Sequence, residues 1–136
     1  MQTLLQILKQ AGGWHHGLYL KIENPPYMAL VIEATDESGP MGLPALSVCH
    51  YGEQNGDLMR DPEMCFELGR ASLDPFYFRN DYLGVEQWSR LIDDRNYVMH
   101  CELHRQHERF AELWDRNLRL QGFLEAFARQ QQTPRA

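Results

Sequence analysis

Three carboxylates between residues 57 and 63 have the residue types and spacing that metal chemistry could use. Asp57, Asp61 and Glu63 follow the pattern Asp-x3-Asp-x-Glu, which loosely resembles a loop that binds a divalent cation. The pattern lacks the Asp-x-Asp-x-Asp-Gly order of an EF-hand, and no lysine follows it as a two-carboxylate nuclease would need. Such side chains also accept backbone N–H bonds in turns, and this interpretation is favoured. The sequence therefore predicts no catalytic residue, no metal ligand and no cofactor.

Histidines near residue 100 form a second candidate metal site. His100, His104 and His107, together with Cys101, have the i, i+4, i+7 spacing with which histidines of one helix face can hold zinc. No His-Glu-x-x-His motif accompanies them, and Glu108 is an ordinary i+4 partner for His104. His104 is expected at the solvent-exposed edge of the helix. Solvated histidines are therefore favoured over a zinc site.

The same acidic segment is also predicted to form the tip of a β-hairpin. Asn55-Gly56 is the strongest short signal for a two-residue turn, and the flanks 45–50 and 64–68 alternate apolar and polar residues. The turn would hold a polar loop out from a sheet, where it could bind a partner. The candidate binding residues of this loop are Tyr51, Glu53, Gln54, Asn55, Asp57, Arg60, Asp61 and Glu63.

Negative charge is concentrated around this hairpin. The formal net charge is −6, whereas the segment from Glu33 to Glu67 contains eight acidic residues and one basic residue and carries −7. Without a basic stripe to neutralise phosphates, the sequence argues against direct nucleic-acid binding. An acidic surface suits a basic protein partner, while an acidic rim that only keeps the protein soluble is the alternative.

Length and composition indicate one globular domain. The chain has 136 residues, of which 43% are hydrophobic and 24% charged, and no apolar run is long enough to span a membrane. The N-terminus lacks the basic region of a signal peptide. Three cysteines (Cys49, Cys65 and Cys101) are isolated and odd in number, which indicates reduced thiols and a cytoplasmic protein.

The order of predicted elements indicates an α+β domain. We expect an N-terminal helix at 2–11, a mainly antiparallel sheet of five to seven strands within 17–101, and a long C-terminal helix at 103–130 packed on one face of the sheet. Residues 84–101 fit either a helix or a hairpin. The residues 93–96 fit a turn between two strands, and Gly84 and Val98 favour the hairpin.

The C-terminal helix is predicted to bury two amides. With Phe110 at the centre of the apolar stripe, Asn117 and Gln121 fall within about 40° of it at 100° per residue. An unpaired buried amide costs about 1–3 kcal/mol, so each should have a partner, and Asn117 or Gln121 should hydrogen-bond the segment 53–63 or the loop 74–82. Gly122 is expected to mark either a kink or the place where another backbone comes close.

Three blocks of sequence together carry a resemblance. They are Glu-Asn-Pro-Pro-Tyr-Met around Tyr27, Tyr-x2-Gln-Asn-Gly-Asp-Leu-Met-x-Asp-Pro-Glu-Met at 51–64, and Phe-x3-Trp-x2-Asn-x3-Gln-Gly-Phe at 110–123. Across about residues 18–127 the chain resembles a family of small domains encoded largely on bacterial plasmids, phages and integrative elements. The family has no established activity. The genes that accompany this family imply an accessory role, in counter-defence or in DNA transfer.

These observations lead to one functional hypothesis and two alternatives. We expect a non-enzymatic accessory protein of a mobile genetic element that presents the acidic hairpin to a basic protein partner. The first alternative is a metal-dependent enzyme that acts on nucleic acid or a nucleotide through Asp57, Asp61 and Glu63. The second is a small-ligand binding module, whose aromatic lining would be Tyr19, Tyr27, Tyr51 and Trp88.

Overall fold

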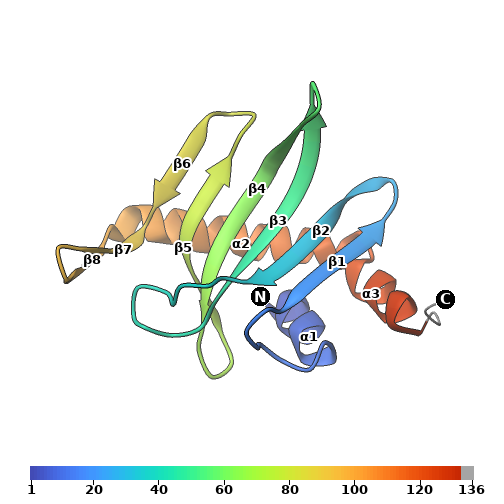
Figure 1. The fold of residues 1–136 in the computed structure, drawn as a ribbon, viewed down its shortest axis with the longest axis horizontal. Coiled ribbons are helices and arrows are strands. Elements are labelled where there is room, and N and C mark those ends of the chain that lie inside the picture. The colour runs from blue at the N-terminus through green and yellow to red at the C-terminus, as the bar shows by residue number, and fades with distance from the viewer. Residues whose placement is uncertain (133–136) are drawn as a thin grey trace.

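A computed structural model describes residues 1–132 and confirms the α+β class. One helix precedes eight strands, and two helices follow them (Figure 1). The helices are α1 (Gln2–Gln10), α2 (Cys101–Leu120) and α3 (Phe123–Gln132). The strands are β1 (Tyr19–Asn24), β2 (Tyr27–Ala34), β3 (Ala45–Gln54), β4 (Asp57–Leu68), β5 (Leu73–Asn80), β6 (Val85–Trp88), β7 (Arg90–Asp93) and β8 (Asn96–Met99).

The main sheet is an antiparallel meander of six strands in the order β1-β2-β3-β4-β5-β6. β3 and β4 are the longest strands, and the predicted Asn55-Gly56 turn joins them, with φ of 51° and 85°. Both residues adopt the left-handed conformation that this turn requires, so the predicted hairpin is confirmed. β7 and β8 form a separate two-stranded sheet around a turn at Asp94 and Arg95. Residues 85–99 are therefore strands and a turn rather than a helix, as the favoured alternative predicted.

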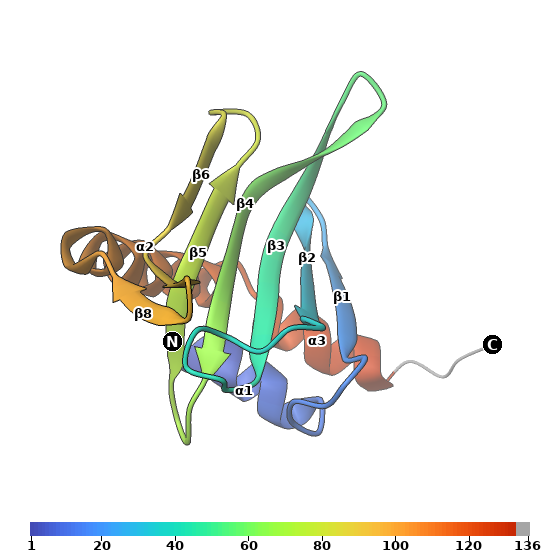
Figure 2. The same ribbon diagram turned by 60° about the vertical axis from the view of Figure 1, so that its left-hand side comes forward.

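All three helices lie on one face of the six-stranded sheet (Figures 1 and 2). Alternate residues of the central strands, including Ile32, Val48, Met64 and Phe66, point to these helices and are fully buried. Trp114, Leu118, Phe123 and Phe127 pack against them from α2 and α3. The opposite face of the sheet carries no helix, so those of its side chains that are exposed are available to a partner.

The C-terminal helical segment differs from the single helix predicted over 103–130. Gly122, with φ of 86°, separates α2 from α3, so the kink is the one of the two expected roles that is observed. The buried residues of α2 are His104, His107, Ala111, Trp114, Asp115 and Leu118. At 100° per residue this face is centred about 90° away from Phe110, which is 38% exposed.

The prediction that Asn117 and Gln121 are buried amides is therefore wrong. The rotated face places Asn117 in solvent, and Gln121 is half-buried at the break between the helices. Gln121 contributes its backbone carbonyl, which accepts a hydrogen bond of 2.8 Å from Nδ2 of Asn24. Among the described residues, no hydrogen bond joins either amide side chain to the segment 53–63 or the loop 74–82. The end of α2 lies next to α3, which packs on β1, at the opposite edge of the sheet from β5 and β6 (Figure 1).

Asp115 of α2 anchors the first helix. Its carboxylate accepts hydrogen bonds from the backbone N–H groups of Thr3 and Leu4, at 3.1 and 2.9 Å. These are first-turn N–H groups that the helix itself leaves unpaired, and α1 has no side-chain cap of its own. A residue more than a hundred positions away therefore caps α1. Within residues 1–132, no helix combines the length and the apolar character that a membrane-spanning helix needs.

Candidate functional site

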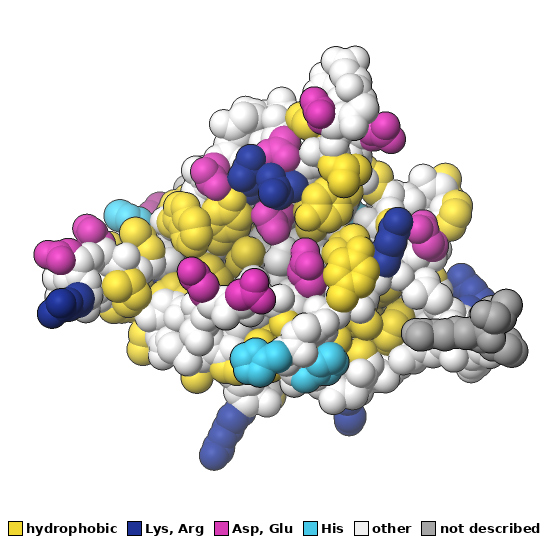
Figure 3. All heavy atoms as spheres, viewed as in Figure 1, with side chains coloured by type: hydrophobic (Ala, Val, Ile, Leu, Met, Phe, Trp, Pro, Cys, Tyr) yellow, Lys and Arg dark blue, Asp and Glu magenta, His cyan; other side chains and the backbone are white. Residues whose placement is uncertain are grey.

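The face of the sheet without helices is the candidate functional surface (Figure 3). Its apolar side chains are interspersed with carboxylates, and basic side chains lie among the carboxylates near its middle. The pleat of β3 and β4 places Ser47 beside Cys65, and Cys49 beside Glu63, on this side. The surface therefore combines a polar centre with apolar flanks.

The predicted hairpin tip stands at one end of this surface. Glu53, Gln54, Asn55 and Asp57 are all exposed there, while Tyr51 lies half-buried nearer the sheet. Burial, with smaller contributions from nearby Cys49 and Glu63, raises the pKa of Tyr51 to about 12, so its phenol stays neutral. The tip thus presents two free carboxylates to solvent.

Arg60 and Glu63, also predicted as binding residues, belong to an ion-pair network in the middle of the face. Nε of Arg60 lies 3.3 Å from Glu63, and Nη1 lies 3.6 Å from Asp81. Ser47 donates a 2.5 Å hydrogen bond to Glu63. Asp81 accepts from the backbone N–H of Arg60 and from Arg79, both at 2.8 Å, and these bonds lower its pKa. The cations here are matched by carboxylates of the same surface.

Asp61 lies outside this ion-pair network and bonds a different partner. Its carboxylate accepts a 3.0 Å hydrogen bond from Nδ2 of Asn80, while Asp57 lies at the exposed tip. Across residues 1–132, no three His, Cys, Asp or Glu side chains converge in a group that could hold a metal ion. The three carboxylates of the Asp-x3-Asp-x-Glu pattern therefore do not form one cluster.

Two cysteines lie on the uncovered face and are buried there. Burial, followed by the nearby charge of Glu63, raises the pKa of the Cys49 thiol to about 12. The same two causes raise the pKa of Cys65 still further. Because the thiolate is the reactive form, both side chains are inert at neutral pH.

The histidine segment is structural. His100 is exposed just before α2, whereas His104 is buried and its Nε2 lies 2.6 Å from Oδ1 of Asp74 in β5. The expectation that His104 is solvated is therefore wrong, because a carboxylate thirty residues away gives it a buried partner. His107 is also buried, and its ring nitrogens bond Ser89 and Gln87 at 2.9 and 3.1 Å.

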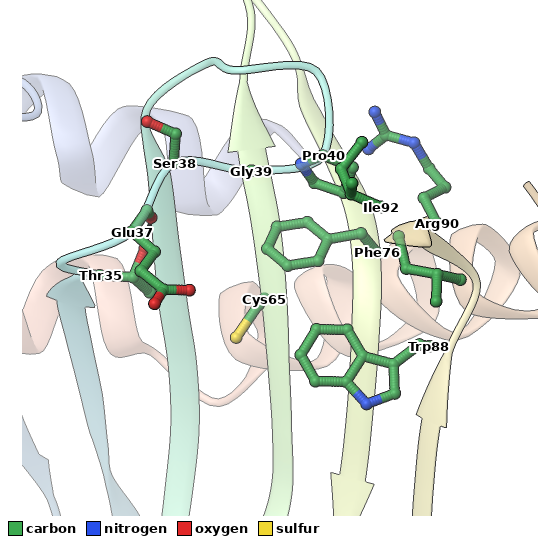
Figure 4. Close-up of a pocket in the computed structure, with 11 residues that line it drawn as sticks. Thr35, Glu37, Ser38, Gly39, Pro40, Cys65, Phe76, Trp88, Arg90 and Ile92 are labelled. Atoms are coloured by element: carbon green, nitrogen blue, oxygen red, sulfur yellow. Dashed lines mark hydrogen bonds between the residues drawn. The ribbon is translucent and has the colours of Figure 1, made fainter. Parts of the chain in front are cut away.

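Hollows open on the uncovered face, and two of them contain residues that the sequence singled out. The larger, of about 500 Å³, lies between the loop 35–44 and β7, and its floor is formed by Cys65, Phe76 and Trp88 (Figure 4). The smaller, of about 360 Å³, lies between Tyr19 and Tyr51 near the hairpin.

The four aromatic residues of the small-ligand hypothesis do not line one pocket. Tyr19 and Tyr51 belong to the smaller hollow, and Trp88 belongs to the larger. Tyr27 packs instead toward Phe123 of α3, with ring centroids 6.3 Å apart.

Sequence reasoning missed the polar pair that builds the larger hollow. Glu67, counted as one of the acids of the charged segment, is buried and bonds Arg90 at the start of β7. Its second oxygen accepts the backbone N–H groups of Met41 and Leu43 at 2.8 and 3.2 Å. Gly39 sits directly over this carboxylate, where a Cβ atom would overlap it. The absence of a side chain at Gly39 was the one local signal of this close approach.

Comparison with other proteins supports the resemblance in the sequence at the level of the family. No curated protein and no solved structure that was compared matches this chain. One family model matches residues 2–124, which is most of the chain and includes both the acidic hairpin and α2. The chain therefore belongs to the family described as Domain of unknown function (DUF6908).

Proposed function

We propose that this protein is a non-enzymatic accessory protein that binds a basic protein partner through the uncovered face of its sheet. The observation that carries the proposal is the distribution of unpaired charge on that face. Glu53 and Asp57 are exposed at the hairpin tip, and Asp36 and Glu37 are exposed on the loop 35–44 at the opposite end of the strands. Both ends of the face are therefore acidic.

The basic residues of the face do not cancel this charge. Arg60 and Arg79 are paired with Glu63, Asp81 and Glu86 of the same network. A surface with unpaired charge of one sign accelerates encounter with an oppositely charged partner and disfavours partners of like charge. Apolar side chains beside the acids, including Leu58 and Trp88, supply area that a partner can bury.

A place among the proteins of a mobile element is part of the same proposal. It is supported by the resemblance of the three sequence blocks to domains encoded on plasmids, phages and integrative elements. In that setting, the basic partner would be a protein of DNA transfer or of a defence system that the element must block. Such proteins act on nucleic acid and commonly present basic surfaces, which an acidic face matches.

Site-specific photocrosslinking in cells that carry the gene tests which face is used. A photoreactive phenylalanine derivative replaces Leu58 at the hairpin tip, or Leu120 at the end of α2 as the matched control. These leucines are 71% and 74% exposed, so their reactivity toward random neighbours is comparable. We expect a discrete adduct with a basic protein from position 58 and none from position 120. Equal adducts from both positions, or an acidic partner at position 58, would contradict the proposal.

A further inference from the structure

The larger hollow on the uncovered face has the size and the walls of a binding pocket. Its volume of about 500 Å³ lies within the range of pockets that hold small ligands, and it is large enough for a long side chain. The loop 35–44 forms one wall and β7 forms the other, as Figure 4 shows. Glu67 and Arg90 tie these two walls together from within, so the pocket is built on a buried interaction.

The floor of this pocket offers an aromatic surface to its occupant. Phe76 and Trp88 lie with ring centroids 6.4 Å apart and planes inclined by 28°. Tyr77 supports Trp88 from the side, at 4.4 Å between centroids. Trp88 is nevertheless 48% exposed, and Ile92 on the β7 wall is 53% exposed. An occupant with a flat polar head and an alkyl stem would cover the indole and the isoleucine together.

The charge of the pocket is that of one carboxylate. Figure 4 shows the side chain of Glu37 extending from the loop toward Cys65, which lies between it and the aromatic rings of Phe76 and Trp88. Among residues 1–132, the Glu37 carboxylate has no hydrogen-bond or ion-pair partner. The one cation in the lining, Arg90, is buried and bonded to Glu67 and Asp74, and its guanidinium points away from Trp88 in Figure 4.

We infer that this pocket receives an arginine side chain of the basic partner. A guanidinium stacks on an indole face through cation–π attraction, and its fork of N–H donors matches a carboxylate. Trp88 would supply the face, Glu37 the carboxylate, and Ile92 the apolar wall for the alkyl stem. The molecule already contains one such contact, since the guanidinium of Arg90 lies 5.7 Å from the ring centroid of Tyr97. The inference deepens the proposed function and rests on it, because the arginine would belong to the basic partner proposed above.

Nuclear magnetic resonance titration of the full chain tests the pocket without the partner. The probe is Nα-acetyl-arginine methylamide, and the comparison compounds are the citrulline analogue, which is neutral, and the lysine analogue. The indole N–H signals of Trp14, Trp88 and Trp114 report binding separately, and a Trp88→Phe variant assigns the signal. We expect the arginine probe to shift Trp88 selectively, with millimolar affinity.

Substitutions separate the pocket from the rest of the acidic face. Glu37→Gln should weaken the arginine probe about fivefold, in line with the loss of one exposed ion pair of about 1 kcal/mol. Glu33→Gln, a change in the neighbouring hollow, should leave the affinity unchanged. The citrulline analogue should bind at least about fivefold more weakly than arginine.

Several results would overturn the inference. These are an unmoved Trp88 signal, equal binding of the citrulline or lysine analogue, and an affinity indifferent to Glu37→Gln. A cross-link to a basic partner at position 58 together with any of these would refute the arginine pocket and leave the proposed function intact. Selective arginine binding at Trp88 without that cross-link would uphold the pocket's specificity and refute the proposed function.

Discussion

The guanidinium of Arg90 and the carboxylate of Glu67 form an ion pair inside the protein, with 4% and 2% of their side chains exposed. Arg90 also bonds Asp74 at 3.2 Å and the hydroxyl of Tyr97 at 2.9 Å. Because Glu67 holds the backbone of the loop 35–44, the pair connects that loop to the β7–β8 hairpin. Both walls of the arginine pocket therefore depend on it.

Removal of one member of this pair should be strongly destabilising. Glu67→Ala would remove the buried partner of Arg90 and leave it only the half-exposed carboxylate of Asp74, and breaking a buried pair costs about 3–5 kcal/mol. Arg90→Met should have an effect of similar size. Urea unfolding of each variant measures it, with Glu53→Ala at the exposed tip as the control.

A double-mutant cycle completes that test. Glu67→Ala combined with Arg90→Met should cost clearly less than the sum of the single changes, because no buried charge is left unpaired. Additive effects of the two substitutions, or single changes that cost under about 1 kcal/mol, would show that the pair is not buried as described.

Asp115 should govern the stability of α1. Asp115→Asn removes the charge that faces the positive end of the helix and one of the two oxygens that accept the N–H groups of Thr3 and Leu4. Hydrogen bonds to charged groups contribute about 1.5–3 kcal/mol, so we expect a loss in this range. Hydrogen exchange should show faster opening of α1 than of the β3–β4 core. Unchanged protection in α1 would exclude this capping role.

The buried histidines should make the protein less stable at mildly acidic pH. Burial, and then the nearby His104, lowers the pKa of His107 from 6.5 to about 4. Between these values the unfolded chain binds a proton that the folded chain does not, so unfolding becomes easier as the pH falls. The stabilisation from the neutral ring is fully present above about pH 6.5 and is lost as the pH falls through about 4, with a slope approaching about 1.4 kcal/mol per pH unit.

Urea unfolding between pH 7.5 and 4.5 measures this slope, and a His107→Gln variant should flatten it. Part of the slope should remain in that variant, because burial also lowers the pKa of His50. The carbon and nitrogen shifts of the His107 ring should show no protonation above about pH 5. Titration of the His107 ring near the ordinary histidine pKa would contradict this account of His107. A slope of stability against pH that is unchanged in His107→Gln would also contradict it.

The elements with strong local signals could be predicted from the sequence. The Asn55-Gly56 turn and the alternating flanks define β3 and β4, and the turn at 93–96 defines β7 and β8. Gly122 was also a local signal, because glycine adopts without strain the left-handed conformation that it has at the break between α2 and α3.

The polar interior could not be predicted in this way. His104, His107 and Asp115 are buried because Asp74, Ser89 and the N-terminus of α1 complete their hydrogen bonds, and these partners come from other elements. Helical periodicity treats such residues as solvent-facing, so the predicted stripe was centred on Phe110 and included Asn117. Glu67 was misjudged for the same reason, because its partner Arg90 lies on another strand.

The acidic hairpin should not hold a divalent metal tightly. Asp61 and Glu63 are already bonded to Asn80, Ser47 and Arg60, and Asp57 lies apart at the tip. Calorimetric titration with Mg²⁺, Mn²⁺ and Ca²⁺ should show no site tighter than about 100 μM, weaker than a dedicated cage of carboxylates. A micromolar site that is lost in Asp57→Asn would instead support the metal-dependent enzyme.

The salt dependence of association with the cross-linked partner tests the central proposal most directly. Screening acts over about 10 Å at 0.1 M salt, so the association rate of the wild-type chain should fall steeply between 50 and 500 mM NaCl. Replacement of Glu53 and Asp57 by lysine should lower the rate at least about tenfold at low salt, while the free energy of unfolding changes by less than about 0.5 kcal/mol. The same reversal at Glu125, which is exposed on α3 away from the acidic face, is the control and should have little effect on the association rate. An association rate that is indifferent to salt and to the hairpin charges would contradict the proposal that this acidic face recruits a basic partner.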